Sequence, residues 1–231
     1  TSGTAVRING GNLTLNEGTT SQITSQISAD TWGSDSVYVS GGSFESLGVL
    51  NITHTGLPND NQYSGGDGTI YQRFAIKSFA VRVQASESGS SSVIIRSGNI
   101  TNTVGGGIYV GQSDISTAEV NVSLGVENRA EGENALSVAT SGTEMFGDNI
   151  KPASGAASNW NYQLTKTGGH AVEVNGGDLT VYDGSYSAKQ GEGLLVKNGT
   201  ATIRGGSFIG NDTYKQGAEM AGPAASYSFK Q

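Results

Sequence analysis

The residues that could carry out acid–base or metal chemistry are few. The two histidines, His54 and His170, stand outside HExxH and other closely spaced ligand pairs, so a zinc site of that kind is not expected. Serines are plentiful, but no GxSxG motif supports a Ser-His-Asp triad. His170 follows Gly168-Gly169 and precedes an apolar stretch, which predicts a histidine in a turn.

Four carboxylates lie close together in sequence and could supply the acidic pair of a glycosidase: Glu173, Asp178, Asp183 and Glu192. Glycoside hydrolysis needs two carboxyl groups roughly 5–10 Å apart. Glu173 stands between two valines, so its side chain is expected to point outward. The next similar stretch has Leu195, Thr200 and Gly205 at matching positions, which favours a solvated face. We therefore predict no catalytic residues.

Ion and phosphate sites have only short sequence signals. Asn59-Asp60-Asn61 and Gly210-Asn211-Asp212 could offer oxygen ligands to calcium, but no EF-hand loop or Gly-rich calcium nonapeptide occurs. The Gly-Gly pairs do not continue as GxxxxGK[ST], so they are better explained as corner glycines with positive φ. No cofactor and no metal are predicted, calcium being the one ion these turns could bind.

Two further sets of residues could contact or carry sugars. Six asparagines head Asn-x-Ser/Thr sequons and are candidate glycosylation sites: Asn12, Asn51, Asn99, Asn121, Asn198 and Asn211. Asn198 and Asn211 fall in predicted turns, where a glycan would be accessible. Four aromatic residues of two long polar segments could stack on sugar rings: Tyr63, Tyr71, Trp160 and Tyr162.

The elements that must position these residues are short strands. Triplets with apolar residues on either side of a variable residue recur, as in Val6-Arg7-Ile8, Val37-Tyr38-Val39 and Val81-Arg82-Val83. Alternation with period two predicts strands with one buried face. Residues 193–210 repeat 171–188 with a register of 22 residues, matching apolar, glycine and aromatic positions. A fixed register of this kind indicates stacked coils.

The repeat extends over most of the chain. Residues 6–15 match 172–181, 37–44 match 201–208, and 93–100 fall in the same register. We predict a single all-β domain over residues 1–231, a parallel β-helix (β-solenoid), right-handed, with three faces and roughly nine coils of about 25 residues. Residues 53–72 and 141–168 are predicted loop insertions, and 214–231 a C-terminal cap or assembly segment.

Composition restricts the class of protein. The 231 residues include 36 glycines, 3 prolines and no cysteine, and only 14% are charged, with a net charge of −7. The absence of cysteine excludes a disulfide scaffold. No Lys/Arg cluster occurs, so no nucleic-acid partner is expected, and no apolar run reaches the roughly 18 residues of a membrane span.

The coil pattern resembles the right-handed β-helices of the pectin-lyase-like superfamily. It is most similar to the non-catalytic surface repeats of autotransporter passengers and polymorphic outer-membrane proteins, which carry GGxI and FxxN signatures. Gly105-Gly106-Gly107-Ile108-Tyr109 is similar to the first, and Phe146-Gly147-Asp148-Asn149 and Phe208-Ile209-Gly210-Asn211 fit the second. The signature blocks of pectate lyases, polygalacturonases and alginate epimerases do not occur here.

These observations leave several functions open. The first is an extracellular or cell-surface structural protein, an adhesin passenger or fibre subunit without catalysis. Its expected partner is another copy in end-to-end self-assembly, a glycan or a host-surface ligand. The alternative is a carbohydrate-binding or polysaccharide-degrading β-helix. A third is an ice- or mineral-binding solenoid, which needs a regular outward threonine ladder; the sequence indicates only Thr180 above Thr202, with Thr14 distant.

Overall fold

The computed structural model describes residues 4–27, 35–56, 62–64, 70–72, 78–86, 89–103, 105–111, 118–141, 143–149 and 162–212. Over these residues the protein is all-β and contains no helix, and most strands join one many-stranded, mainly parallel sheet. Strands distant in sequence pair side by side with parallel register. This arrangement is compatible with the predicted β-solenoid.

The parallel pairs form three ladders. The first ladder contains β1 (Val6–Ile8), β4 (Val37–Ser40), β8 (Phe79–Gln84), β10 (Gly106–Gly111) and the first halves of β15 (Val172–Val181) and β18 (Leu194–Ile203). The second contains β2 (Gly11–Leu15), the first halves of β5 (Gly42–Gly56) and β9 (Ser91–Asn102), β11 (Val120–Leu124), and the second halves of β15 and β18. The third contains β3 (Thr20–Ile27), the second halves of β5 and β9, β12 (Leu136–Thr140), β16 (Ser185–Ala188) and β19 (Ser207–Asp212).

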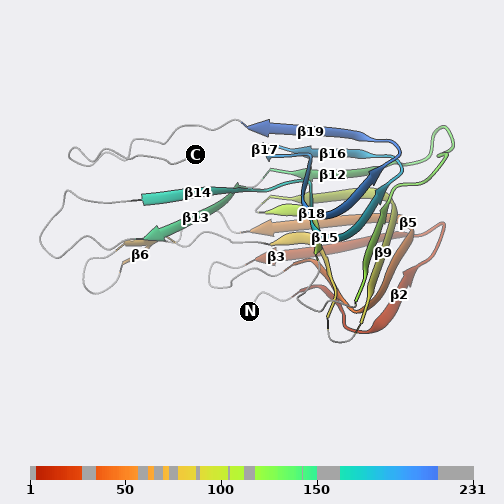
Figure 1. Ribbon diagram of the computed structural model, residues 1–231, viewed down its shortest axis with the longest axis horizontal. Helices are drawn as coiled ribbons and strands as arrows, with labels where there is room; N and C mark the ends of the chain where they lie inside the picture. Colours follow the sequence, from red (N-terminus) through yellow and green to blue (C-terminus); the bar gives the residue numbers. More distant parts are fainter. Residues whose placement is uncertain are drawn as a thin grey trace, which may run out of the picture.

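Each ladder runs from the N-terminal to the C-terminal end of a single stack. Figure 1 shows β2 and β3 at one end of the stack and β19 at the other. Each ladder has six segments among the described residues, fewer than the roughly nine coils predicted. The prediction assumes about 25 residues per coil over the whole length, whereas several coils contain long segments outside the ladders.

The 22-residue register is confirmed by the strand pairing. Val172 pairs with Leu194, Val181 with Ile203 and Tyr186 with Phe208. The rings of Tyr186 and Phe208 stack with centroids 5.0 Å apart and planes inclined by 13°. Adjacent coils therefore place like side chains above one another, as the sequence repeat predicts.

One predicted sequence match, of residues 37–44 to 201–208, is wrong because the two stretches lie in different ladders. Residues 37–40 belong to the first ladder and 42–44 to the second, whereas 201–203 belong to the second and 207–208 to the third. The two segments look alike because both corners use an apolar strand, a glycine and an aromatic residue in the same order. Residues 93–100 do share the faces of 201–208.

Gly98 shows why a corner needs glycine. Its φ is +122°, and a Cβ atom added there would lie 1.9 Å from the Leu50 carbonyl oxygen on the neighbouring coil. No L-residue with a side chain fits this close approach without moving the backbone. The bend between the second and third ladders in β9 is thus made possible by a missing side chain.

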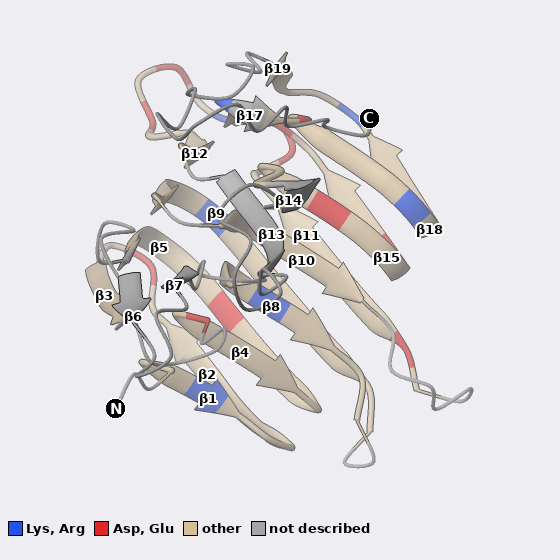
Figure 2. Ribbon diagram, turned by 90° about the vertical axis from the view of Figure 1, so that its left-hand side faces the viewer, with Lys and Arg blue, Asp and Glu red and all other residues tan. Residues whose placement is uncertain are grey.

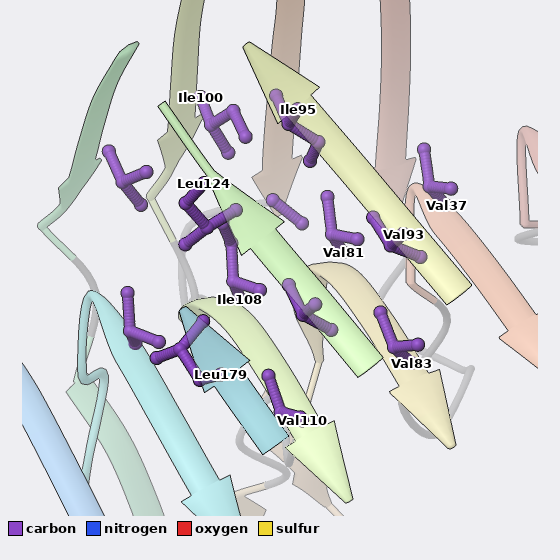
Figure 3. Packing of buried hydrophobic residues seen from close by; sticks show 14 of the residues in the cluster. Val37, Val81, Val83, Val93, Ile95, Ile100, Ile108, Val110, Leu124 and Leu179 are labelled. Carbon is purple, nitrogen blue, oxygen red and sulfur yellow. The ribbon is translucent and has the colours of Figure 1, made fainter. Parts of the chain in front are cut away.

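The core lies between the three ladders. Alternate residues of each strand point inward, and Val37, Ile95 and Leu124 are among those with no exposed surface. Figure 3 shows these side chains converging from strands far apart in sequence. Each fully buried aliphatic side chain contributes about 2 kcal/mol, so the shared core stabilises coils that could not fold singly.

The two predicted insertions contain antiparallel pairs. β6 (Gln62–Ser64) pairs with β7 (Ile70–Gln72), and β13 (Thr143–Asn149) with β14 (Tyr162–Gly168). β5 continues to Gly56, so residues 53–56 of the first predicted insertion belong to the third ladder. A short strand, β17 (Gln190–Gly191), pairs with β19 in antiparallel sense. The predicted cap at 214–231 lies outside the described residues.

Candidate ligand-binding face

A row of outward residues runs along the first ladder. These are the middle residues of the apolar triplets, and strand register places them side by side in the order Arg7, Tyr38, Arg82, Tyr109, Glu173 and Leu195. Their neighbours within each strand are mostly buried, so the row faces away from the core. In Figure 2 the charged segments of β1, β8 and β15 lie on this face. We call these six residues the Arg–Tyr row.

Tyr38 is held between the first and third coils of the row. The Arg7 guanidinium carbon lies 4.5 Å from the centroid of the Tyr38 ring, a cation–π contact. Gln84 Nε2 donates to the Tyr38 hydroxyl at 2.8 Å. Arg7 is exposed and Tyr38 half-buried. One end of the row therefore offers a guanidinium to solvent and a phenol fixed in orientation.

Arg82 is fixed by a carboxylate and two rings. Its Nε lies 2.8 Å from Asp35 Oδ2, and its guanidinium carbon lies 4.9 Å from the Phe79 centroid and 4.8 Å from that of Tyr109. The Phe79 backbone N–H donates to Asp35 Oδ1 at 2.8 Å. Burial raises the pKa of the Asp35 carboxyl and outweighs the lowering by Arg82. The centre of the row is thus rigid and preorganised.

Tyr109 lies over a glycine. A Cβ atom added to Gly111, two residues further along β10, would lie 2.2 Å from Tyr109 Cε1. The ring therefore occupies the space above Gly111, and Asn175 Nδ2 donates to its hydroxyl at 3.3 Å. The ring also packs against the Phe79 ring, with centroids 5.0 Å apart, and the Arg82 guanidinium lies over it. Tyr109 is half-buried, so part of its side chain stays open to solvent, and an exposed part of an aromatic ring can contact the C–H surface of a sugar.

The four candidate carboxylates do not form one site. Glu173 lies in the Arg–Tyr row, where it is buried and not solvated as predicted, and it accepts a hydrogen bond from Lys197 Nζ at 2.7 Å. Asp178 is exposed on the second ladder. Asp183 lies at the corner between the second and third ladders, where its Oδ2 is 2.5 Å from Arg129 Nε. Glu192 contacts His170 in the turn before β15, the position predicted for that histidine. Register places these acids on different faces and corners.

His54 belongs to a buried polar column that the sequence did not reveal. Its Nδ1 lies 2.6 Å from Ser25 Oγ and 2.8 Å from Ser36 Oγ, and the side chain is fully buried. Ser25, His54, Asn102 and Thr140 are successive register partners on the third ladder. Burial lowers the pKa of His54 to about 4. The imidazole is neutral at neutral pH and part of the corner structure.

The aromatic candidates for sugar contact lie in the two antiparallel pairs. Tyr63 and Tyr71 are register partners, and Tyr162 is opposite Asn149; Trp160 lies outside the described residues. Both pairs leave after a strand of the third ladder, β5 or β12, and return before one of the first, β8 or β15. They therefore border the face that carries the Arg–Tyr row.

The sequons all lie in strands. Asn198 and Asn211, predicted in turns, belong to β18 and β19 and are exposed there. Asn12, Asn99 and Asn121 are also exposed, whereas Asn51 is half-buried. Asn51 Oδ1 accepts hydrogen bonds from the backbone N–H of Asn99 at 3.2 Å and from its Nδ2 at 3.3 Å. A glycan on either of these two would crowd the other.

The two turns predicted as possible calcium ligands lie far apart in the chain. Asn59-Asp60-Asn61 lies outside the described residues, and Gly210-Asn211-Asp212 lies in β19. The described part of the chain has no group of three His, Asp or Glu side chains that could hold a metal ion. Nor do those residues form a helix of the length and hydropathy that crossing a membrane requires.

The third ladder carries a row of threonines that was not predicted from the sequence. Thr24, Thr53 and Thr101 are register partners on the outside of the third ladder. Thr180 does pair with Thr202 on the second ladder, as predicted. The third-ladder row was missed because insertions give its coils unequal lengths. The same inequality hid the Arg–Tyr row, although the triplets that contain it are visible in the sequence.

Comparison of the chain with models of protein families, with curated proteins and with solved structures finds no match.

Proposed function

We propose that this chain is a right-handed, three-faced β-solenoid of an extracellular or cell-surface protein, an adhesin passenger or fibre subunit without catalytic activity. The observation that carries the proposal is that the positions repeating from coil to coil are structural: buried aliphatic side chains, corner glycines and the Tyr186–Phe208 stack. A shared core of this kind makes a stiff support whose outward rows are free to contact a partner.

The support for a surface role is in the outward rows. The third ladder presents Thr24, Thr53 and Thr101, and beside them Asn51 and Asn99, without a charged residue among these five. Ser, Thr and Asn side chains hydrogen-bond to water without the repulsion that a charged face would have. The polar outer surface and the sequons agree with an extracellular location, because N-linked glycans are typical of secreted and surface proteins.

Turnover assays test the non-catalytic part of the proposal. The purified chain is incubated with acidic and neutral polysaccharides, and reducing ends and unsaturated products are measured. We expect no product above the level of a heat-denatured sample. Product that grows in proportion to protein concentration would contradict the proposal and favour the polysaccharide-degrading alternative.

Carbohydrate binding is the second candidate function, and the Arg–Tyr row favours it. The row combines the exposed guanidinium of Arg7 with the Tyr109 ring over Gly111, so it offers both hydrogen-bond donors and a stacking face. The two antiparallel pairs that border the face would enclose a ligand on one side. A sugar chain lying across the strands would meet Tyr38 and Tyr109 roughly 10 Å apart, two strand spacings.

A glycan array with matched variants tests this second function. Tyr109→Ala removes the ring of the row, whereas Tyr182→Ala removes a half-buried tyrosine that also lies near an arginine, Arg204, but at another corner. Stacking of one sugar is worth about 1 kcal/mol, so Tyr109→Ala should weaken binding about fivefold and Tyr182→Ala should leave it unchanged. Equal effects of the two variants, or no glycan bound by the native chain, would exclude the row as the binding site.

A further inference from the structure

The C-terminal end of the stack exposes apolar side chains, and the N-terminal end has half-buried ones: Val6, Leu13, Leu15 and Ile23. At the C-terminal end, Val196, Ile203 and Ile209 are 45%, 44% and 53% exposed, the large hydrophobic residues that stand out on the described surface. Within the described residues, β18 pairs only with β15, and β1 only with β4. Open edges of parallel ladders present unpaired N–H and C=O groups that can accept another strand. Figure 2 shows β1 and β18 at opposite ends of the first ladder.

The two ends match when their ladder positions are compared. Counting along each ladder through its register partners aligns the first coil with the last: Val6 with Leu194, Ile8 with Val196, Leu13 with Ala201, Leu15 with Ile203, and Ile23 with Phe208. All five inward positions are apolar at both ends. Residues 6–15 also match 172–181, the stretch on which β18 is already stacked. The first coil therefore has the sequence pattern of an interior coil, one that packs against neighbours on both sides.

Charge at one corner is complementary between the ends. The corner between the second and third ladders carries three ion pairs along the stack: Arg96 Nη1–Glu17 Oε1 at 2.6 Å, Arg129 Nε–Asp183 Oδ2 at 2.5 Å, and Arg204 Nη1–Glu127 Oε1 at 3.7 Å. The column begins with the acid Glu17 in the first coil and ends with the base Arg204 in the last. Stacking the first coil of a second copy on the last coil would place Glu17 beside Arg204.

We propose that copies of this chain associate head to tail, with the first coil of one copy stacked in parallel register on the last coil of another. The inference rests on the proposed fibre-subunit form of the function and identifies its partner as a second copy. The junction would extend all three ladders, cover Ile203 with Leu15 and pair Arg204 with Glu17. Such a head-to-tail contact does not close, so it yields filaments.

Charge reversal in the full chain tests the junction. Sedimentation and electron microscopy measure assembly of the native chain, of Arg204→Glu, of Glu17→Arg and of the double variant. We expect concentration-dependent filaments of the native chain, at least about tenfold weaker association for each single variant because like charges then meet, and recovery in the double variant. Glu119→Arg, the same charge change at an exposed site away from the ends, should leave assembly unchanged.

A second variant does not depend on the ion pair. Ile203→Asp puts a carboxylate into the apolar junction at a position that is already partly exposed in the single chain, so it should abolish filaments without unfolding the coil. A native chain that stays monomeric at the highest soluble concentration overturns the inference; protected β18 and β19 amides in that monomer would identify residues 213–231 as the cover. Filaments that persist in Ile203→Asp and all charge variants also overturn it. Polysaccharide turnover, in contrast, would overturn the proposed function and not the junction.

Discussion

At the scale of single residues, His54 is a buried base held by hydroxyl groups. Its Nδ1 is within hydrogen-bonding distance of Ser25 Oγ and Ser36 Oγ, and its side chain has no contact with solvent. Burial disfavours the charged imidazolium and lowers the pKa of His54 from 6.5 to about 4. The folded protein therefore binds a proton at this site less readily than the unfolded chain does.

Acid should destabilise the fold through His54. A lowered pKa in the folded state means that the contribution is fully present above pH 6.5 and is lost as the pH falls from 6.5 through 4. The loss amounts to about 3 kcal/mol between these limits. Urea unfolding at several pH values measures it. In His54→Gln the free energy of unfolding should decline less steeply as the pH falls. Burial raises the pKa of Asp35, so Asp35 changes the free energy of unfolding with pH in the opposite direction. That contribution is the same in both proteins and cancels in the comparison. Parallel curves for the two proteins would show that His54 does not titrate on unfolding.

Three glycines separate steric from conformational effects. Gly98 has positive φ and no room for Cβ, Gly18 has φ +72° but nothing within 4 Å of an added Cβ, and Gly11 has free space and no positive φ. Replacement by alanine should cost about 3 kcal/mol or more at Gly98, about 1 kcal/mol at Gly18, and almost nothing at Gly11. Chemical denaturation of the three variants gives the order. A Gly98→Ala protein as stable as Gly11→Ala would contradict the close stacking of coils.

At the scale of elements, the Arg129 side chain makes several of the contacts that hold segment 125–135 to the stack. Arg129 Nη2 donates to the Arg96 carbonyl oxygen at 2.7 Å, its Nη1 donates to the Asn134 carbonyl, and its Nε pairs with Asp183. Burial raises the pKa of Asp183, but hydrogen bonding to Arg129 more than compensates and the net pKa lies below its usual range. The segment is thus held by this cation together with backbone hydrogen bonds at its two ends, from Gly125 N–H to the Ile95 carbonyl and from Gly98 N–H to the Ala135 carbonyl.

Removing Arg129 should loosen this segment without unfolding the ladders. In Arg129→Ala, hydrogen exchange of the amides of 125–135 should accelerate while those of β11 and β12 stay protected, and overall stability should fall by about 2 kcal/mol. Arg204→Ala is a suitable control because its ion pair with Glu127 is exposed. Faster exchange throughout β11 and β12 would instead show that the ion pair holds the ladders themselves.

The sequence predicts which residues form strands better than it predicts which strands pair with one another. The 22-residue register between β15 and β18 is visible because no insertion separates these strands, and the pairing of Tyr186 with Phe208 follows from it. Tyr109 and Glu173 are also register partners, but residues 141–168 intervene, so a search for a fixed period cannot align them. The Arg–Tyr row and the His54 column depend on such long-range register, which is set by core packing. The positions of Tyr63, Tyr71 and Tyr162 depend on antiparallel pairs that lie outside the repeat.

At the scale of the whole molecule, one core supports three outer faces with different chemistry. The first ladder carries aromatic and charged side chains, and the third carries threonine and asparagine rows. The two antiparallel pairs leave at the corner between these ladders. Binding on the first ladder and assembly through the ends would therefore use separate surfaces and could act together.

A pair of introduced cysteines tests directly whether strands on either side of a long insertion stack in register. The native chain has no cysteine, so any disulfide reports only the introduced residues. Tyr109 and Glu173 are register partners on adjacent strands, a separation of about 4.8 Å that a disulfide can bridge. Asp178 lies in the second ladder and serves as the mismatched position. An in-register stack predicts rapid oxidation of Tyr109→Cys/Glu173→Cys and slow oxidation of Tyr109→Cys/Asp178→Cys, measured by thiol titration. Equal rates in the two proteins would contradict it.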